Sequence, residues 1–191
     1  MSYEPLAPGD MAAVVTYLEM DRRPEGHAVP PSSLSLHHVA NPQPEPYRAL
    51  FRLVGTPWLW FSRLELDDAA LAATIGELFE VRDGDQVVGM LELDFRTEGE
   101  CELAYVGLVP SHAGKGHGRW LLAEAVDRAW REGVRKVHVH TCTLDHPAAV
   151  SAYRRAGFIP VRQAIERFRD PRLTGLYPAD AAPDIPLLGT S

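Results

Sequence analysis

The length, composition and charge of the chain exclude several classes of protein. Its 191 residues, 46% of them hydrophobic, suit one domain with a substantial core rather than two domains. The net charge of −7 argues against a broad basic surface for nucleic acid. No apolar run approaches the roughly twenty residues of a membrane span, and the first residues, MSYEPLAPGD, lack the pattern of a signal peptide. We therefore expect a cytoplasmic protein that binds neither nucleic acid nor membrane.

The first third of the chain predicts a strand, a long loop and a helix. Residues 13–20 begin with β-branched and aromatic side chains, which favours a strand. Residues 21–46 contain six of the sixteen prolines and are expected to be mostly surface loop, with a short strand at 33–39. From Tyr47, apolar residues recur at i, i+3, i+4 and i+7, which predicts a helix that ends at Gly55.

A connection rich in aromatic residues, 56–66, follows this helix. Because exposing large aromatic side chains is costly, its tryptophans Trp58 and Trp60 either pack on the core or line a pocket. Core packing is the more frequent fate of such residues. A second helix is predicted to begin at the cap residue Asp67.

Three strands are expected next. Residues 78–95 form a predicted hairpin that turns at Asp83-Gly84-Asp85, and a third strand is predicted at 102–109. After the glycine-rich stretch described below, a strand is predicted at 136–143, a helix at 148–156 and a last strand at 158–167.

The stretch 105–130, YVGLVPSHAGKGHGRWLLAEAVDRAW, combines a strand pattern, three alternating glycines and an amphipathic helix pattern. Glycines at such a junction let the backbone approach a ligand, and the first helical turn presents free N–H groups. A phosphate is the expected ligand. A Walker loop does not fit, because Lys115 is followed by Gly116 instead of Ser or Thr. A dinucleotide fingerprint does not fit either, because Leu121 stands where its third glycine should be.

Two motifs resemble those of the GNAT (Gcn5-related) N-acetyltransferase family. Residues 113–118, AGKGHG, resemble the coenzyme A pyrophosphate loop Arg/Gln-x-x-Gly-x-Gly/Ala, with Ala113 in place of Arg or Gln. Residues 146–158, HPAAVSAYRRAGF, resemble the pattern Asn-x-x-Ala-x-x-x-Tyr-x-x-x-Gly-Phe, with His146 in place of Asn. The resemblance covers residues 80–167, and the earlier part of the chain matches by layout only.

The resemblance implies an α/β (α+β) GNAT fold. Its sheet would be mixed, mostly antiparallel and twisted, with about six to seven strands and about four helices, and splayed at the cofactor site. We expect one acetyltransferase domain over residues 1–170, best supported over 80–167, and an extended C-terminal tail over 171–191. The resemblance also implies acetyl-CoA as co-substrate without a metal, a primary amine of a small molecule or peptide as acceptor, direct attack in a ternary complex, and a homodimer.

Residue roles are also implied by the resemblance. Tyr153 stands at the family's tyrosine position, where its phenol, protonated at neutral pH, would donate a proton to the departing thiolate; the alternative is an aromatic core residue. In the family layout the connection after the first helix forms a wall of the acceptor pocket, which makes Trp58 and Trp60 substrate candidates. The implied cofactor-binding residues are Val106, Leu108, Val109, Ala113, Gly114, Lys115, Gly116, His117, Gly118, Arg119, His146 and Ala149.

Glu102 is the candidate general base. Its spacing before Ala113 resembles that of the base glutamate in the histone acetyltransferase branch, and strand alternation places it on the face of Val106. The alternatives are a solvated glutamate at a strand start, and deprotonation through water without a dedicated base. Glu92 and Asp94 on the preceding strand are alternates, or would bind the ammonium group of the acceptor.

No metal site is expected. His138 and His140 share one face of a predicted strand, but two histidines without a third ligand are more often packed or solvated than metal-binding. The two cysteines, Cys101 and Cys142, form no CxxC pair, so neither a zinc site nor a disulfide framework is indicated.

Two other functions fit the same motifs. The substitutions Ala113 and His146 are consistent with a GNAT-fold module that binds coenzyme A without turnover. An acyltransferase that uses another acyl-CoA, or an oxygen nucleophile, is the second alternative.

Overall fold

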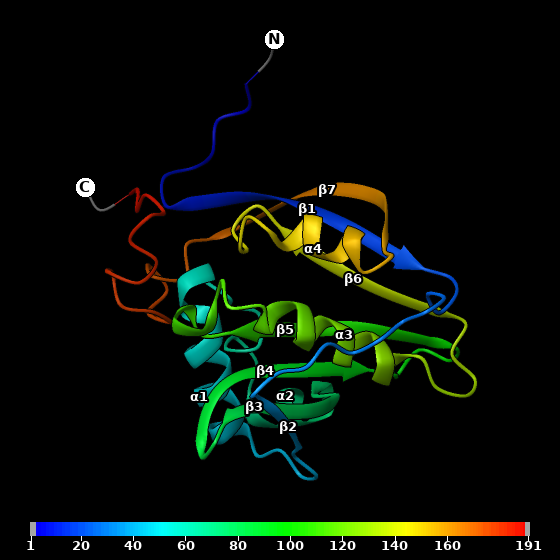
Figure 1. Cartoon of the computed structure of the whole chain (residues 1–191). Helices are drawn as coiled ribbons and strands as arrows, with labels where there is room; N and C mark the ends of the chain where they lie inside the picture. The colour runs from blue at the N-terminus through cyan, green and yellow to red at the C-terminus, as the bar shows by residue number, and fades with distance from the viewer. Residues whose placement is uncertain (1–2, 190–191) are drawn as a thin grey trace.

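The protein is built on one seven-stranded sheet with the order β2-β3-β4-β5-β6-β1-β7 (Figure 1). The computed structural model describes residues 3–189. All neighbouring strands are antiparallel except β5 and β6, which run parallel. The strands are β1 (Asp10–Met20), β2 (Ser35–His38), β3 (Glu77–Asp83), β4 (Gln86–Asp94), β5 (Glu100–Leu108), β6 (Lys136–Cys142) and β7 (Ile159–Arg169).

Four α-helices accompany the sheet within residues 3–189, which confirms the predicted mixed sheet and helix content. They are α1 (Pro44–Gly55), α2 (Asp68–Thr74), α3 (His117–Ala129) and α4 (Ala149–Arg155). As predicted, Asp67 caps α2, because its carboxylate accepts a hydrogen bond from the amide of Ala70 at 2.8 Å. No helix of the described residues is long and apolar enough to cross a membrane.

The core has two parts, one on each face of the sheet. On one face the buried side of α3, including Leu121 and Val126, packs on β4 and β5. On the other face Phe51 and Val54 of α1 pack against Met90 of β4. Both helices show the apolar spacing that predicts a helix with one buried face. The sheet therefore has one helical layer over each face, and its central strands are covered on both sides.

The strand predicted at residues 13–20 is present as β1. In the sheet it lies far from β2, the strand that follows it in the sequence. β1 pairs with β6 on one side and β7 on the other, whereas β2 is the opposite edge of the sheet. The loop 21–34 therefore crosses the molecule over α3 (Figure 1). There His27 Nε2 lies 2.9 Å from the carbonyl oxygen of Ala123, and Ser32 Oγ lies 3.0 Å from His117 Nδ1.

A β-bulge in β5 changes which side chains face the site. Glu92 pairs with Tyr105 and the next residue, Leu93, pairs with Leu103, so Ala104 is an extra residue. Leu103 before the bulge and Val106 after it consequently pack in the same, α3-side core. Glu102 therefore lies on the face opposite Val106, and the strand face predicted for Glu102 from simple alternation is wrong.

The C-terminal segment is folded onto the domain rather than extended as predicted. Residues 171–189 form turns, and Tyr177, Ala181 and Ala182 are buried in the same core cluster as Phe51 of α1. The Tyr177 hydroxyl donates a hydrogen bond to the Trp60 carbonyl oxygen at 2.5 Å. The segment thus supports the connection that carries the two tryptophans.

Candidate active site

A fork between β5 and β6 organises the candidate site. Parallel pairing joins Glu100 to Lys136, Cys101 to Val137 and Glu102 to His138. β5 continues to Leu108 and β6 to Cys142, but no further pairs join the two strands. The expected splay of the sheet is therefore present, and β5 has backbone groups on its β6 side that the sheet does not use.

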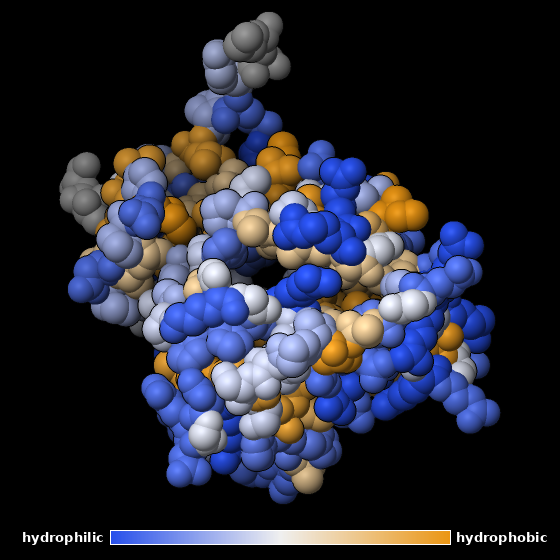
Figure 2. Space-filling model, viewed as in Figure 1, coloured by the Kyte–Doolittle hydropathy of each residue, from blue (hydrophilic) through white to orange (hydrophobic). Residues whose placement is uncertain are grey.

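A cavity of about 780 Å³ occupies this fork. Its walls come from β5, the glycine turn, α3, β6, α4, β7 and the connection after α1. The space-filling view shows the molecule hollowed near the middle of this face (Figure 2). Its size is typical of a site for a small molecule or cofactor.

The glycine turn forms the end of the cavity at the start of α3. Gly114 and Gly116 have φ angles of 75° and 86°, a backbone conformation that favours glycine. Apart from their chain neighbours and the backbone of their own helix, no atom of residues 3–189 lies within 4 Å of a Cβ added at Gly114, Gly116 or Gly118, and all three line the cavity. The turn therefore leaves space against its backbone, and the N–H groups of the first turn of α3 suit a phosphate there.

Nine of the twelve predicted cofactor-binding residues line this cavity. They are Val106, Leu108, Ala113, Gly114, Gly116, Gly118, Arg119, His146 and Ala149. Three others do not. The amide of Val109 donates to the Val88 carbonyl oxygen at 2.9 Å, His117 contacts Ser32, and Lys115 is not a lining residue. Ala113 lacks the polar side chain of the family position, but the basic side chain of Arg119 belongs to a lining residue of the cavity.

Tyr153 lines the same cavity from α4. Its ring packs edge-on against Phe158 at a centroid distance of 5.8 Å. Burial, followed by the negative charge of Asp145, raises the pKa of the Tyr153 phenol above its ordinary value. The hydroxyl therefore stays protonated throughout the neutral range and can act as a proton donor.

The tryptophans Trp58 and Trp60 both line the cavity. The Trp60 indole N–H donates to Asp145 Oδ1 at 2.9 Å. The Trp58 ring packs edge-on against the His146 ring at 5.5 Å between centroids. The connection after α1 is thus attached to the turn before α4, on the other side of the fork.

Asp145 precedes α4 and holds two parts of the site together. Its second oxygen, Oδ2, accepts hydrogen bonds from the Thr141 hydroxyl at 2.7 Å and from the Cys142 amide at 2.9 Å. The carboxylate therefore joins the end of β6 to Trp60. Its position between a strand and a Pro-initiated helix indicated a cap, but the sequence gives no sign of the distant indole partner.

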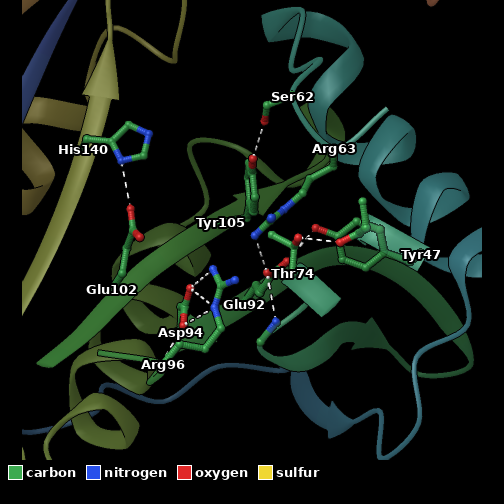
Figure 3. A network of polar contacts seen from close by, with 12 residues as sticks. Tyr47, Ser62, Arg63, Thr74, Glu92, Asp94, Arg96, Glu102, Tyr105 and His140 are labelled. Carbon is green, nitrogen blue, oxygen red and sulfur yellow. Dashed lines mark hydrogen bonds and ion pairs between the residues drawn. The ribbon is translucent and has the colours of Figure 1, made fainter. Parts of the chain in front are cut away.

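Glu102 contacts His140 across the fork (Figure 3). His140 Nδ1 lies 3.0 Å from Glu102 Oε1. This hydrogen bond lowers the pKa of Glu102 and raises the pKa of His140, and burial opposes both shifts. His140 lines the cavity, whereas Glu102 is not among the lining residues. The histidine is thus the member of the pair that a ligand meets.

Glu92 and Asp94 are not among the residues that line the cavity, which corrects their expected contact with an acceptor. Glu92 is fully buried, and its carboxylate accepts hydrogen bonds from the Tyr47 hydroxyl at 2.6 Å and from Arg63 at 2.8 Å. Asp94 is paired with Arg96 in a bidentate contact. Burying a carboxylate requires such partners, so neither acid is available for an ammonium group.

An open sheet whose parallel central pair forks beside a glycine turn is the arrangement of the GNAT acetyltransferase fold. The sequence model described as the acetyltransferase (GNAT) family matches residues 37–158, and the chain belongs to this family. None of the curated proteins matches the chain.

Solved structures share this fold at low sequence identity. A GCN5-related N-acetyltransferase from Sphaerobacter thermophilus is 22% identical with a TM-score of 0.54, over 85% of this chain and 52% of its own. One from Kribbella flavida is 22% identical with a TM-score of 0.53, over 87% and 63% of the two chains. A GNAT family acetyltransferase from Elizabethkingia anophelis, solved with acetyl-CoA bound, is 18% identical with a TM-score of 0.54, over 69% and 80%. The first two are longer proteins, of which this chain spans about half to two thirds.

Proposed function

We propose that the protein transfers an acetyl group from acetyl-CoA to a primary amine of a small molecule or peptide. The observation that carries the proposal is one cavity at the strand fork that joins the glycine turn to the Tyr153 hydroxyl. Membership of the GNAT family and the related structure with bound acetyl-CoA support it.

The residues of the fork suit coenzyme A. The open space at Gly114, Gly116 and Gly118 would receive the diphosphate on backbone amides, with Arg119 as the charged side chain nearby. The main chain of Val106–Leu108, on the side of β5 that β6 leaves, would hold the extended arm. When bound, acetyl-CoA supplies an activated acetyl thioester.

Side chains of the protein would then donate and accept the protons of the reaction. An ammonium ion must lose a proton before its nitrogen can attack, and the sulfur leaves more readily when it receives a proton and departs as a thiol. Tyr153 holds the donor proton at its hydroxyl oxygen, because burial raises the pKa of that phenol. The Glu102–His140 pair is the proton acceptor on the other wall. Trp58, Trp60 and Phe61 line the cavity and would form the wall beside the acceptor.

Calorimetry with acetyl-CoA tests the binding step, and absence of binding at millimolar ligand would refute the proposal. Thiol release with an amine panel tests turnover. Tyr153→Phe should lower kcat by about 10²-fold or more while leaving acetyl-CoA affinity unchanged. If the wild type binds acetyl-CoA and releases thiol with none of the amines, the chain is a silent coenzyme A-binding module instead.

A further inference from the structure

The fork places one histidine where the sheet opens. His138 is the last residue of β6 that pairs with β5, opposite Glu102. His140 lies two residues further along β6 on the same strand face, beyond the last pair. Its ring lies beside the Tyr17 ring of β1, with 5.9 Å between their centroids, and lines the cavity. His140 thus stands at the opening between the two strands.

We propose that His140 is the general base that takes a proton from the acceptor's ammonium group, and that Glu102 is its positioning residue. The inference rests on the proposed acetyl transfer. It differs from the prediction that Glu102 itself is the base, because His140 is the member of the pair that reaches the cavity.

The hydrogen bond between the pair fixes which nitrogen is basic. A carboxylate only accepts hydrogen bonds, so the contact of 3.0 Å places the proton of neutral His140 on Nδ1. The lone pair is then on Nε2, for which the described part of the chain provides no hydrogen-bond partner. A side chain in this state can receive a proton on Nε2 without breaking its contact with Glu102.

The charges around His140 stabilise the protonated form. Asp145 before α4 and Glu166 on β7 add to the effect of Glu102 on the pKa of His140. On the β1 side lies Tyr17, whose ring is covered by the Arg162 guanidinium at 3.7 Å from the centroid. The imidazole is therefore surrounded by three carboxylates and by one arginine that the Tyr17 ring shields. This arrangement favours the protonated form of His140.

Intrinsic basicity also favours histidine. An alkylammonium group has a pKa of about 10.4, an imidazole about 6.5 and a glutamate about 4.3. Transfer of the ammonium proton to imidazole is therefore less unfavourable than its transfer to a carboxylate, by about two pKa units or roughly 10²-fold. The raised pKa of His140 and the lowered pKa of Glu102 widen that difference.

The acceptor nitrogen loses two protons during the transfer. Neutral His140 Nε2 takes one ammonium proton, which frees the amine lone pair. The C–N bond forms as the thioester C–S bond breaks, and the thiolate takes the hydroxyl proton of Tyr153. The new amide nitrogen releases a second proton, which returns to the Tyr153 oxygen. His140 then loses its proton to solvent, which its half-exposed side chain can reach.

The test compares acceptors that do and do not need a base. The full chain and its variants His140→Gln, Glu102→Gln and the control His138→Gln are assayed for thiol release with acetyl-CoA. 2-Phenylethylamine and 1,4-diaminobutane are ammonium ions at pH 7, whereas hydroxylamine is already neutral. His138 shares the strand face of His140 but is not a lining residue, so His138→Gln should match the wild type.

His140→Gln should lower kcat/KM for the two alkylamines by about 10²–10⁴-fold and leave hydroxylamine turnover and acetyl-CoA binding close to wild type. Glu102→Gln should retain most of the alkylamine activity at high pH. The acidic limb of its pH–rate profile should move to lower pH, because the imidazolium loses its carboxylate partner and its pKa falls. A merely structural glutamate would not move that limb.

Alkylamine turnover that survives in His140→Gln but is abolished in Glu102→Gln would overturn the assignment in favour of Glu102. Equal loss with hydroxylamine and alkylamines would also overturn it, since the defect would then not concern deprotonation. These outcomes leave acetyl transfer itself intact. Wild-type protein that binds acetyl-CoA but turns over none of the three acceptors would overturn both the base and the proposed function.

Discussion

Trp60 donates its indole N–H to Asp145, and this one hydrogen bond of 2.9 Å joins the wall after α1 to the turn before α4. The two residues are 85 positions apart in the sequence. The same carboxylate holds the end of β6 through Thr141 and Cys142. The fork therefore has a fixed width at the level of the tryptophans, although its two strands are not paired there.

Replacing Trp60 by phenylalanine should weaken this connection. The change keeps an aromatic ring but removes the donor, so we expect a loss of about 1.5–3 kcal/mol in the free energy of unfolding. The KM for the acceptor should rise, and acetyl-CoA affinity should change little. Urea unfolding measures the free energy of unfolding, and steady-state kinetics measure the KM for the acceptor. Trp58→Phe is the matched control, because Trp58 contacts His146 through its ring only; equal effects of the two changes would contradict the role of the hydrogen bond.

Substitution of Gly118 by alanine should affect folding and binding in opposite directions. Gly118 lies in the first turn of α3, and within the described residues an added Cβ would meet no atom within 4 Å outside its chain neighbours and its own helix backbone. Alanine in a helix is favoured over glycine by about 0.5–1 kcal/mol, so the unfolding free energy should hold or rise. The methyl group would enter the phosphate space, and we expect at least a tenfold loss of acetyl-CoA affinity by calorimetry, about 1.4 kcal/mol.

Gly116→Ala is the companion variant. Its φ of 86° is unfavourable for a residue with a Cβ, so it should also lose about 1–2 kcal/mol of stability. Unchanged acetyl-CoA affinity in both variants would mean that the glycine turn is not the phosphate site.

The sequence motifs predicted the glycine turn and the helix that follows it, and the reason is local. Glycines and a helix start need only neighbouring residues, so the turn at 113–118 and Tyr153 could be read from short patterns. The bulge at Ala104 could not, because the alternation of β5 gives no sign of an extra residue. Glu102 was consequently assigned to the wrong strand face.

The partners of the charged residues were equally hidden from the sequence. Glu92 and Asp94 suggested an acidic acceptor site, but Arg63 lies 29 residues from Glu92 and neutralises it. The strand β1 was predicted from its β-branched residues, yet its place between β6 and β7 depends on pairing with residues more than a hundred positions away. Such pairing follows from the whole core and not from local preference.

The Glu102–His140 pair should stabilise the protein in a limited pH window. The folded-state pKa of His140 is raised. Its contribution to the free energy of unfolding is therefore complete below about pH 6.5 and is lost as the pH rises through the folded-state pKa. The pKa of Glu102 is lowered, so its contribution is present above about pH 4.3 and is lost as the pH falls through the folded value. The coupling free energy should therefore be largest between about pH 4.3 and 6.5.

A double-mutant cycle with Glu102→Gln and His140→Gln, measured by urea unfolding from pH 4 to 9, checks this window. The coupling should stay below about 1 kcal/mol because His140 is half-exposed to solvent. The exposed pair Arg131–Glu77, which contains no histidine, is the control, and its cycle should be flat from pH 6 to 9. A coupling for Glu102–His140 that is equally flat would contradict the prediction.

The buried pair of Asp170 and Arg172 should be decisive for the C-terminal segment. Arg172 Nη2 lies 2.7 Å from Asp170 Oδ2, and the guanidinium also donates to the carbonyl oxygens of Ala181 and Ile185. Arg172→Met leaves a buried carboxylate unpaired, so we expect a loss of about 3–5 kcal/mol in unfolding free energy. Arg167→Met removes an exposed pair with Glu4 and should leave stability unchanged. A small effect of Arg172→Met would contradict the prediction.

The position of β1 also determines when this half of the sheet can form during synthesis. β1 ends at Met20, but both of its neighbours belong to the last third of the chain, and β7 ends only at Arg169. At about 5–20 residues per second, roughly 7–30 seconds separate the appearance of β1 from the completion of β7. Until β6 is complete at Cys142 the first strand has no partner on either side, whereas β3, β4 and β5 pair with immediate neighbours as they emerge. The half of the sheet that carries Tyr17 and His140 is thus the last to be assembled on the ribosome.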